Sequence, residues 1–114
     1  MYEVMRFGGK EVPMAATAAT PVYYKTVFQD DVLAKFGNPD AEIDWVGKLA
    51  YIMAKQGAGE IESASYDDFV KWLDKFDPLD IFGVEENNAV ITLFGKQQKT
   101  TVDAKKKSVR QSAK

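Results

Sequence analysis

The chain has 114 residues, of which 46% are hydrophobic and 12% aromatic, and its net charge is −2. This length suits a single domain with enough apolar material for a core. Neither Cys nor His occurs, which excludes disulfides, thiol nucleophiles, Ser-His-Asp triads and zinc sites built on those side chains. No apolar run approaches the roughly 20 residues that cross a membrane. The first residues do not resemble a signal peptide, so we expect a cytoplasmic protein. We also expect no cofactor.

Residues 2–16 are predicted to form a β-hairpin, because Gly8-Gly9 suits a two-residue turn with positive φ. The turn sets Phe7 opposite Lys10, Arg6 opposite Glu11, Met5 opposite Val12 and Glu3 opposite Met14. One face then carries the apolar side chains of Met5, Phe7, Val12 and Met14. An isolated hairpin is marginally stable, so this face must pack on helices or on another chain. We expect the face, with a strand edge left free at Pro13, to be a self-association surface.

The small residues 15–19 lead to a first predicted helix, with Thr20 as its cap and Pro21 in its first turn. Apolar residues follow at helical spacing: Tyr24, Val27, Phe28, Val32 and Phe36. Gly37-Asn38-Pro39 should end this helix.

A second helix is predicted from a cap at Asp40 to residues 57–59. Its apolar positions are Ile43, Val46, Leu49, Ala50 and Met53, widened by Trp45, Tyr51 and Ile52. A helix this apolar around its circumference should be central or face two partners.

A third helix should begin at a capping box formed by Ser65 and Asp68, and end before Pro78. The last helical stretch is predicted over residues 79–94. The short run at 90–94 also permits a strand, because periodicity does not separate the two alternatives. The expected fold is therefore mainly α, with an N-terminal β-hairpin followed by about four helices.

Charge divides the chain into two parts. Residues 1–95 carry 8 basic and 16 acidic side chains, net −8, and residues 96–114 carry 7 basic and one acidic, net +6. We therefore expect a folded domain over 1–95 and a disordered, flexible basic tail over 96–114, which has too few apolar residues to bury. Its basic cluster is Lys105, Lys106, Lys107 and Arg110. The tail has no aromatic residue to stack on bases, so an acidic protein partner is favoured over nucleic acid.

Residue pairs that suggest catalysis have simpler structural interpretations. The acidic pairs Asp30-Asp31, Asp67-Asp68 and Glu85-Glu86 place adjacent side chains about 100° apart on a helix, so neither carboxylate converges on the other. The glycines at 8–9 and 57–59 lack the longer spacing and Lys-Ser/Thr of a phosphate loop. These patterns indicate a binding protein and not an enzyme.

The chain has 14 aromatic residues, counting seven Phe, five Tyr and two Trp. Most should be buried, but this number exceeds what a small core is expected to hide. A surplus on the surface would mark a protein interface. The candidates at the margins of the helical stripes are Tyr23, Trp45, Tyr51 and Trp72.

Residues 7–36, FGGKEVPMAATAATPVYYKTVFQDDVLAKF, resemble the N-terminal region of tail assembly chaperones from long-tailed phages of Gram-positive hosts. The matching features are the Gly8-Gly9-Lys10-Glu11 turn, the Ala/Thr-rich link 15–20, Pro21, Tyr24, Phe28 and Leu33. Beyond this segment the later helices agree only in type and length.

The resemblance implies a chaperone that binds the tape-measure protein in the bacterial host, self-associates, and is absent from the mature virion. It also implies a longer product, made by programmed frameshifting, that recruits the major tail protein. Codons for Lys105–Lys107 are a candidate slippery site. Two other functions remain open: a head–tail connector, or a nucleic-acid-associated regulator that acts through the basic tail.

Overall fold

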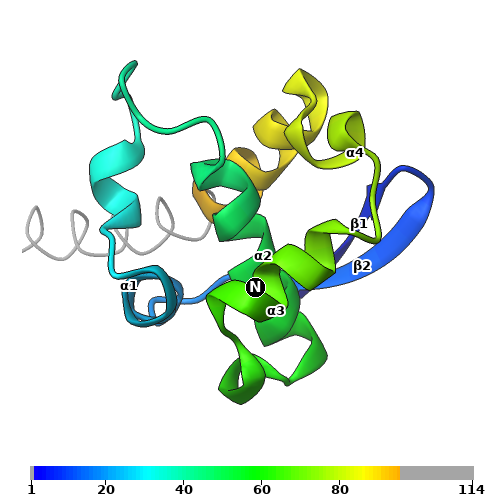
Figure 1. Cartoon of the computed structure of the whole chain (residues 1–114), viewed down its shortest axis with the longest axis horizontal. Coiled ribbons are helices and arrows are strands. Elements are labelled where there is room, and N and C mark those ends of the chain that lie inside the picture. The colour runs from blue at the N-terminus through cyan, green and yellow to red at the C-terminus, as the bar shows by residue number, and fades with distance from the viewer. Residues whose placement is uncertain (1, 96–114) are drawn as a thin grey trace, which may run out of the picture.

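The structure is a computed structural model that describes residues 2–95. It confirms a mainly helical fold with an N-terminal antiparallel hairpin. The elements are β1 (Tyr2–Phe7), β2 (Lys10–Ala15), α1 (Thr20–Phe28), the 3-10 turn η1 (Val32–Lys35), α2 (Trp45–Ala58), the 3-10 turn η2 (Ile61–Ser63), α3 (Tyr66–Leu73), α4 (Pro78–Phe82) and a last helix over residues 84–95. Figure 1 shows α2 at the centre, with the hairpin and the other helices around it.

The hairpin has the predicted register. Phe7 pairs with Lys10 and Met5 with Val12, and Gly8 and Gly9 adopt φ of 58° and 83°. Both central residues of a two-residue type I′ turn require positive φ, which explains the glycines. On the outer face Arg6 and Glu11 form the predicted ion pair, at 2.9 Å. This pair is highly exposed, so it fixes register more than it adds stability.

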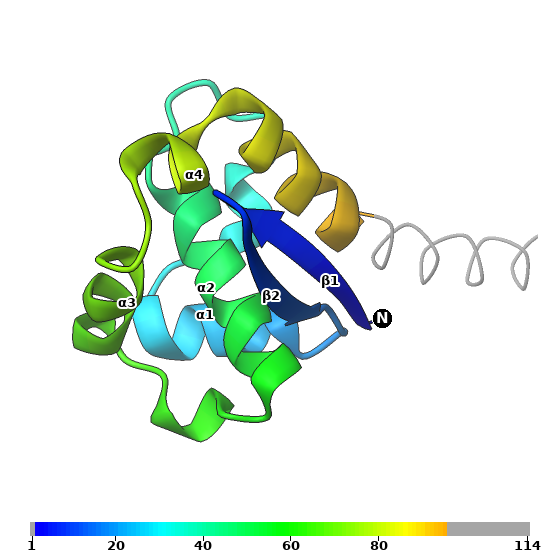
Figure 2. The same cartoon turned by 90° about the vertical axis from the view of Figure 1, so that its right-hand side faces the viewer.

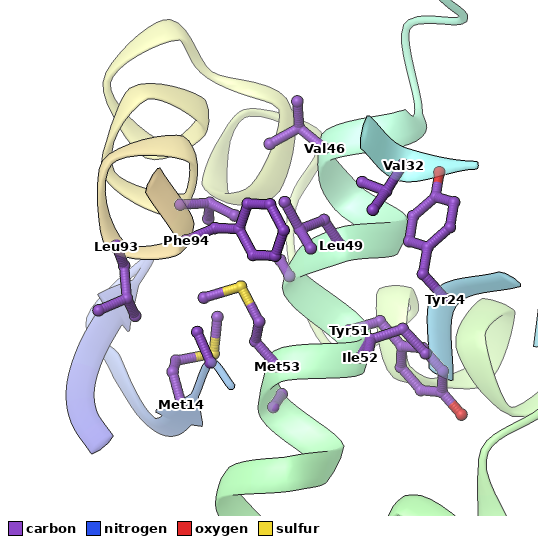
Figure 3. Packing of buried hydrophobic residues seen from close by; sticks show 14 of the residues in the cluster. Met14, Tyr24, Val32, Val46, Leu49, Tyr51, Ile52, Met53, Leu93 and Phe94 are labelled. Carbon is purple, nitrogen blue, oxygen red and sulfur yellow. The ribbon is translucent and has the colours of Figure 1, made fainter. Parts of the chain in front are cut away.

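The hairpin packs beside α2, as Figure 2 shows from the side, and the side chains of its apolar face belong to the core. The approach is closest at Gly57, where an added Cβ would lie 2.3 Å from the carbonyl oxygen of Pro13. Glycine is therefore required here by space, since the helix backbone lies directly against the strand. Figure 3 shows Met14 and Met53 facing Leu93 and Phe94 of the last helix across the same core.

α2 is the central element, as predicted. Eight of its residues are buried, namely Val46, Gly47, Leu49, Ala50, Tyr51, Ile52, Met53 and Ala54. Its start differs from the prediction, because the helix begins after Asp44 and not at Asp40. The backbone N–H of Asp40 donates to the side chain of Asn38 at 3.0 Å, in a local turn that competes with helix formation. Ile43 consequently lies outside the helix and is 85% exposed.

The first helix is shorter than predicted. It ends at Phe28, after which Gln29 adopts a left-handed φ of 54° and donates its N–H to the carbonyl of Lys25. The two aspartates that follow bind local backbone: Asp30 accepts from the N–H of Asp31, and Asp31 accepts from that of Leu33. Such side-chain bonds stabilise turns at the expense of a continuing helix, so the prediction of one helix to Phe36 is wrong.

The link into α1 is held by a polar contact that the sequence did not indicate. Thr20 is fully buried and makes no capping bond, which corrects its predicted role. Its hydroxyl donates to the side-chain oxygen of Gln56 at 2.5 Å, and the Gln56 amide nitrogen donates to the hydroxyl of Thr17 at 3.2 Å. One side chain of α2 thereby fixes both ends of the turn before α1.

The C-terminal half contains one more break than predicted. Ser65 caps α3 by accepting from the N–H of Asp68 at 3.0 Å, as predicted. The expected stretch over 79–94 is divided at Gly83, whose extended backbone separates α4 from the helix of residues 84–95. Residues 90–94 belong to that helix, so the alternative of a strand is wrong.

Candidate functional site

The apolar face of the hairpin is part of the core and is not a free surface. Phe7 and Met14 are 1% and 0% exposed, and Met5 and Val12 are half-buried against the same cluster. Of the two predicted possibilities, packing on helices or on another chain, these four residues show the first. Phe7 and Met14 are therefore not accessible to a second copy of the folded chain, because the chain's own core covers them, and self-association through the rest of the hairpin stays a prediction.

The four aromatic residues proposed for a protein interface lie in different places. Tyr51 is fully buried, which contradicts its predicted position at a margin. Tyr23, Trp45 and Trp72 are half-buried and pack against the core. The two Trp rings contact other aromatic rings: Trp45 lies 5.2 Å from Phe36 between centroids, and Trp72 lies 5.8 Å from Tyr51. They retain only partial access to a partner, and their binding role remains a prediction.

The ring contacts form two groups, a larger one around Phe28 and a smaller one of Phe36, Trp45 and Phe94. Phe28 alone lies within 6.3 Å of Tyr24, Tyr51, Tyr66 and Phe69, measured between ring centroids. Edge-to-face contacts of this kind add stability beyond the area that they bury. The expected surplus of exposed aromatics is thereby reduced to two residues in the part of the chain that the structure describes, Tyr2 and Tyr66.

The exposed apolar surface is mainly aliphatic, which the sequence analysis missed. Seven aliphatic side chains are strongly exposed: Val4, Val22, Leu33, Ile43, Val70, Leu79 and Val84. Several lie where a predicted helix breaks. Leu33 follows the Asp30-Asp31 turn, and Ile43 precedes the true start of α2. The aspartates and Asn38-Pro39 were therefore the signals that these residues leave the buried stripe.

One exposed aliphatic residue borders a concave apolar surface, which we name the apolar cleft. It has a volume of about 230 Å³ and is lined by Leu33, Phe36, Phe94 and Gly95. Phe36 and Phe94 stack with their planes 12° apart and their centroids separated by 5.4 Å. Leu33 is 52% exposed at the margin. Among residues 2–95, no charged side chain lines the cleft, so a ligand there would be recognised through apolar contact.

Several charged side chains of the described residues form ion pairs that hold neighbouring segments together. The ammonium of Lys35 lies 2.9 Å from Asp30 and 2.7 Å from Glu42 and lowers the pKa of both carboxyls. Burial, with a smaller contribution from Asp30, raises the pKa of Tyr24. Within residues 2–95, no group of acidic residues converges as a metal site requires. The pairs Asp30-Asp31 and Asp67-Asp68 thus contribute to turns, a helix cap and ion pairs, whereas Glu85-Glu86 takes part in no ion pair of the described region.

The basic cluster of Lys105, Lys106, Lys107 and Arg110 lies outside the described residues. In the described part of the chain, none of the helices has the length and apolar content needed to span a bilayer.

Comparison of the chain with protein-family models, with curated proteins and with solved structures finds no match. None of these comparisons supports the resemblance of residues 7–36 to tail assembly chaperones, which stays an expectation from the sequence.

Proposed function

We propose that this protein is a tail assembly chaperone of a long-tailed phage, which binds the tape-measure protein before the tail tube forms. The observation that carries the proposal is the apolar cleft, with Leu33 exposed at its margin. Leu33 and Phe36 both belong to the segment that resembles the family. A chaperone of a long helical client needs accessible apolar surface, and it must later release that client.

The cleft suits such a client because of its chemistry and shape. An amphipathic helix places apolar side chains at intervals of three and four residues into a groove of this kind. A shallow site gives each contact a modest free energy, so binding is reversible. Repetition of the contact along a long client would supply the total affinity through avidity. Self-association of the chaperone along the client is part of this proposal.

The proposal also distinguishes this chain from a stable structural component. A head–tail connector remains in the particle, whereas a chaperone leaves during assembly. Mass spectrometry of purified virions should therefore detect the tape-measure protein and not this chain. Finding the chain at stoichiometric amounts in virions would favour the connector.

Co-expression with the tape-measure protein of the same phage tests the binding site. The wild-type chain should increase the soluble fraction of the tape-measure protein and remain with it through affinity purification. Leu33→Lys should reduce both several-fold, because a charge at the margin of the cleft opposes burial of an apolar client. Ile43→Lys is the matched control, since Ile43 is 85% exposed and does not line the cleft.

The two variants separate loss of binding from loss of folding. Both should retain the circular dichroism spectrum and thermal unfolding midpoint of the wild type, because both sites are exposed. Equal solubilisation by wild type and Leu33→Lys would refute the cleft as the binding site. Failure of the wild type to solubilise the tape-measure protein would refute the chaperone proposal itself.

The longer frameshifted product and its binding to the major tail protein are a separate part of the proposal. Sequencing of the gene should show a slippery heptamer within the codons for Lys105–Lys107 and an overlapping downstream reading frame. A gene without either feature would remove this part and leave the client-binding proposal intact.

A further inference from the structure

A second cleft, between β1 and the helix of residues 84–95, differs in character from the apolar cleft. We name it the strand–helix cleft. It has a volume of about 470 Å³ and is lined by Glu3, Met5, Glu85, Asn88, Ala89, Thr92 and Leu93. Figure 2 shows β1 and this helix side by side, with the end of the helix near the start of the strand. The cleft combines an apolar floor with two carboxylates.

The two carboxylates have no cation to neutralise them within residues 2–95. Neither Glu3 nor Glu85 takes part in the ion pairs of this region, and no Lys or Arg lines the cleft. The whole of residues 1–95 carries a net charge of −8. The cleft is therefore a site of negative potential, which favours a cationic occupant.

The strand β1, whose Glu3 and Met5 line the cleft, is also an open edge of the sheet. The sheet has two strands, and because Phe7 and Lys10 close a two-residue turn, the backbone groups of Tyr2, Val4 and Arg6 point away from β2. In β2 the corresponding outward position is occupied by Pro13, which has no N–H, and Gly57 of α2 packs against its carbonyl. β1 is thus the edge with free donors and acceptors for a further segment of chain.

The chain contains a segment with the complementary charge, and it begins three residues after Leu93, which lines the cleft. Residues 96–114 carry 7 basic side chains and one acidic. They follow Gly95, the last described residue of the helix that forms one wall. Nineteen residues can extend roughly 60 Å, whereas a six-residue strand is roughly 20 Å long. The segment therefore reaches the whole cleft of its own chain.

We propose that residues 96–114 bind the strand–helix cleft of the same chain, with Lys and Arg side chains contacting Glu3 and Glu85. Because the segment is tethered to the cleft, its effective concentration there is in the millimolar range, and a weak contact is sufficient for occupancy. The segment then shields the β1 edge from other strands. This inference goes beyond the chaperone proposal and does not depend on it.

Paramagnetic relaxation in the full chain tests the proposal directly. The chain has no Cys, so Ser108→Cys provides a unique site for a nitroxide label. In the wild-type body at low salt, the backbone amides of Glu3, Met5, Asn88 and Thr92 should lose at least half of their intensity relative to the reduced label. Most of the intensity should return at about 0.5 M NaCl, where charge interactions are screened.

Charge reversal identifies the contact. Glu3→Lys/Glu85→Lys, made in the labelled chain, should restore the intensity of the cleft amides at low salt. The matched control is Glu60→Lys/Glu62→Lys, which changes the net charge equally at two exposed residues that do not line the cleft. The control should retain the broadening at the cleft.

Three results would overturn the proposal. The first is an absence of broadening at the cleft amides at low salt. The second is equal recovery in the cleft variant and the control, which would mean a nonspecific effect of net charge. The third is equally strong broadening in a mixture of unlabelled 15N chain with spin-labelled 14N chain, which would assign the contact to a second copy.

Discussion

The hydroxyl of Tyr51 lies between the two ends of the capping box of α3. It donates to Asp68 Oδ2 at 2.6 Å and accepts from the backbone N–H of Ser65 at 3.1 Å. In an ordinary capping box the third residue of the helix would itself accept from the N–H of the cap. Here the Tyr51 hydroxyl of α2 lies between the two groups and bonds to both, an arrangement that we call the relay. The start of α3 is therefore tied to the centre of the core.

Tyr51→Phe should lower the free energy of unfolding by about 1–3 kcal/mol, because it removes the acceptor of the Ser65 N–H and one of the two partners of the Asp68 carboxylate, the other being Lys55. Urea denaturation followed by circular dichroism measures this change. Tyr66→Phe is the control: Tyr66 is 54% exposed, and surface changes of this kind are usually within about 0.5 kcal/mol. Equal stability of the two variants would show that the relay contributes nothing.

Replacing Tyr24 by Phe should not lower the free energy of unfolding, in contrast to Tyr51→Phe. Tyr24 is 0% exposed, and its hydroxyl has no hydrogen-bond partner among residues 2–95. Burial of an unpaired hydroxyl costs about 1–3 kcal/mol, so Tyr24→Phe should leave stability unchanged or increase it. The measurement is again urea denaturation. A loss of 1 kcal/mol or more, by the scale of a typical hydrogen bond, would mean that the hydroxyl has a partner, such as an ordered water.

Acid stability should depend on Lys55. Its ammonium lies 2.7 Å from Asp68 and, with the Tyr51 hydroxyl, holds the pKa of the Asp68 carboxyl below its usual range. A carboxyl with a lowered pKa in the folded state binds fewer protons there than in the unfolded state. Its contribution is therefore present above the unfolded pKa of about 3.9 and is lost as the pH falls through the folded value.

Lys55→Met should raise the pKa of Asp68 toward its ordinary value and remove part of that contribution. A 13C NMR titration of the side-chain carboxyl measures the pKa. Lys71→Met provides the comparison, because Lys71 is exposed and makes no ion pair within the described residues. An unchanged Asp68 titration in Lys55→Met would exclude the ammonium as the cause.

Gly57→Ala should destabilise the protein although alanine favours helices. The added Cβ would lie 2.3 Å from the Pro13 carbonyl oxygen, so α2 and β2 must separate. Overpacking of this kind costs about 1–3 kcal/mol, more than the roughly 1 kcal/mol gained in helix propensity. Thermal unfolding measures the difference. Gly95→Ala is the matched helical control, because no atom of the described residues lies within 4 Å of its added Cβ. A stability gain at both sites would contradict the close approach.

Local patterns predicted the hairpin in full. The Gly8-Gly9 turn and the period of two determine the register, because a shift by one residue would turn Phe7 and Met14 out of the core. The cap at Ser65 was equally visible. In these places the signal and the structure involve neighbouring residues, so sequence alone is sufficient.

The sequence predictions that were wrong concern places where a side chain bonds to the backbone or to a distant element. Asp31 ends the run that looked like a helix through Phe36, and periodicity does not register such a bond. Thr20 was predicted as a cap, yet its hydroxyl accepts from the N–H of Thr17 and donates to Gln56, 36 residues away. The apolar cleft was missed for the same reason, since Phe36 meets Phe94 only after the chain has folded. Tertiary partners of this kind leave no local pattern.

The contacts of the hairpin turn also determine when this part of the protein can finish folding during synthesis on the ribosome. Lys10 donates to the backbone carbonyl of Lys75, 65 residues later, and its ammonium lies 5.3 Å from the centre of the Phe76 ring. At about 5–20 residues per second, the nascent hairpin waits roughly 3–13 s for these partners. Until then Phe7, which packs on Phe76, lacks one of its contacts. The earliest part of the protein to be made is thus among the last to be completed.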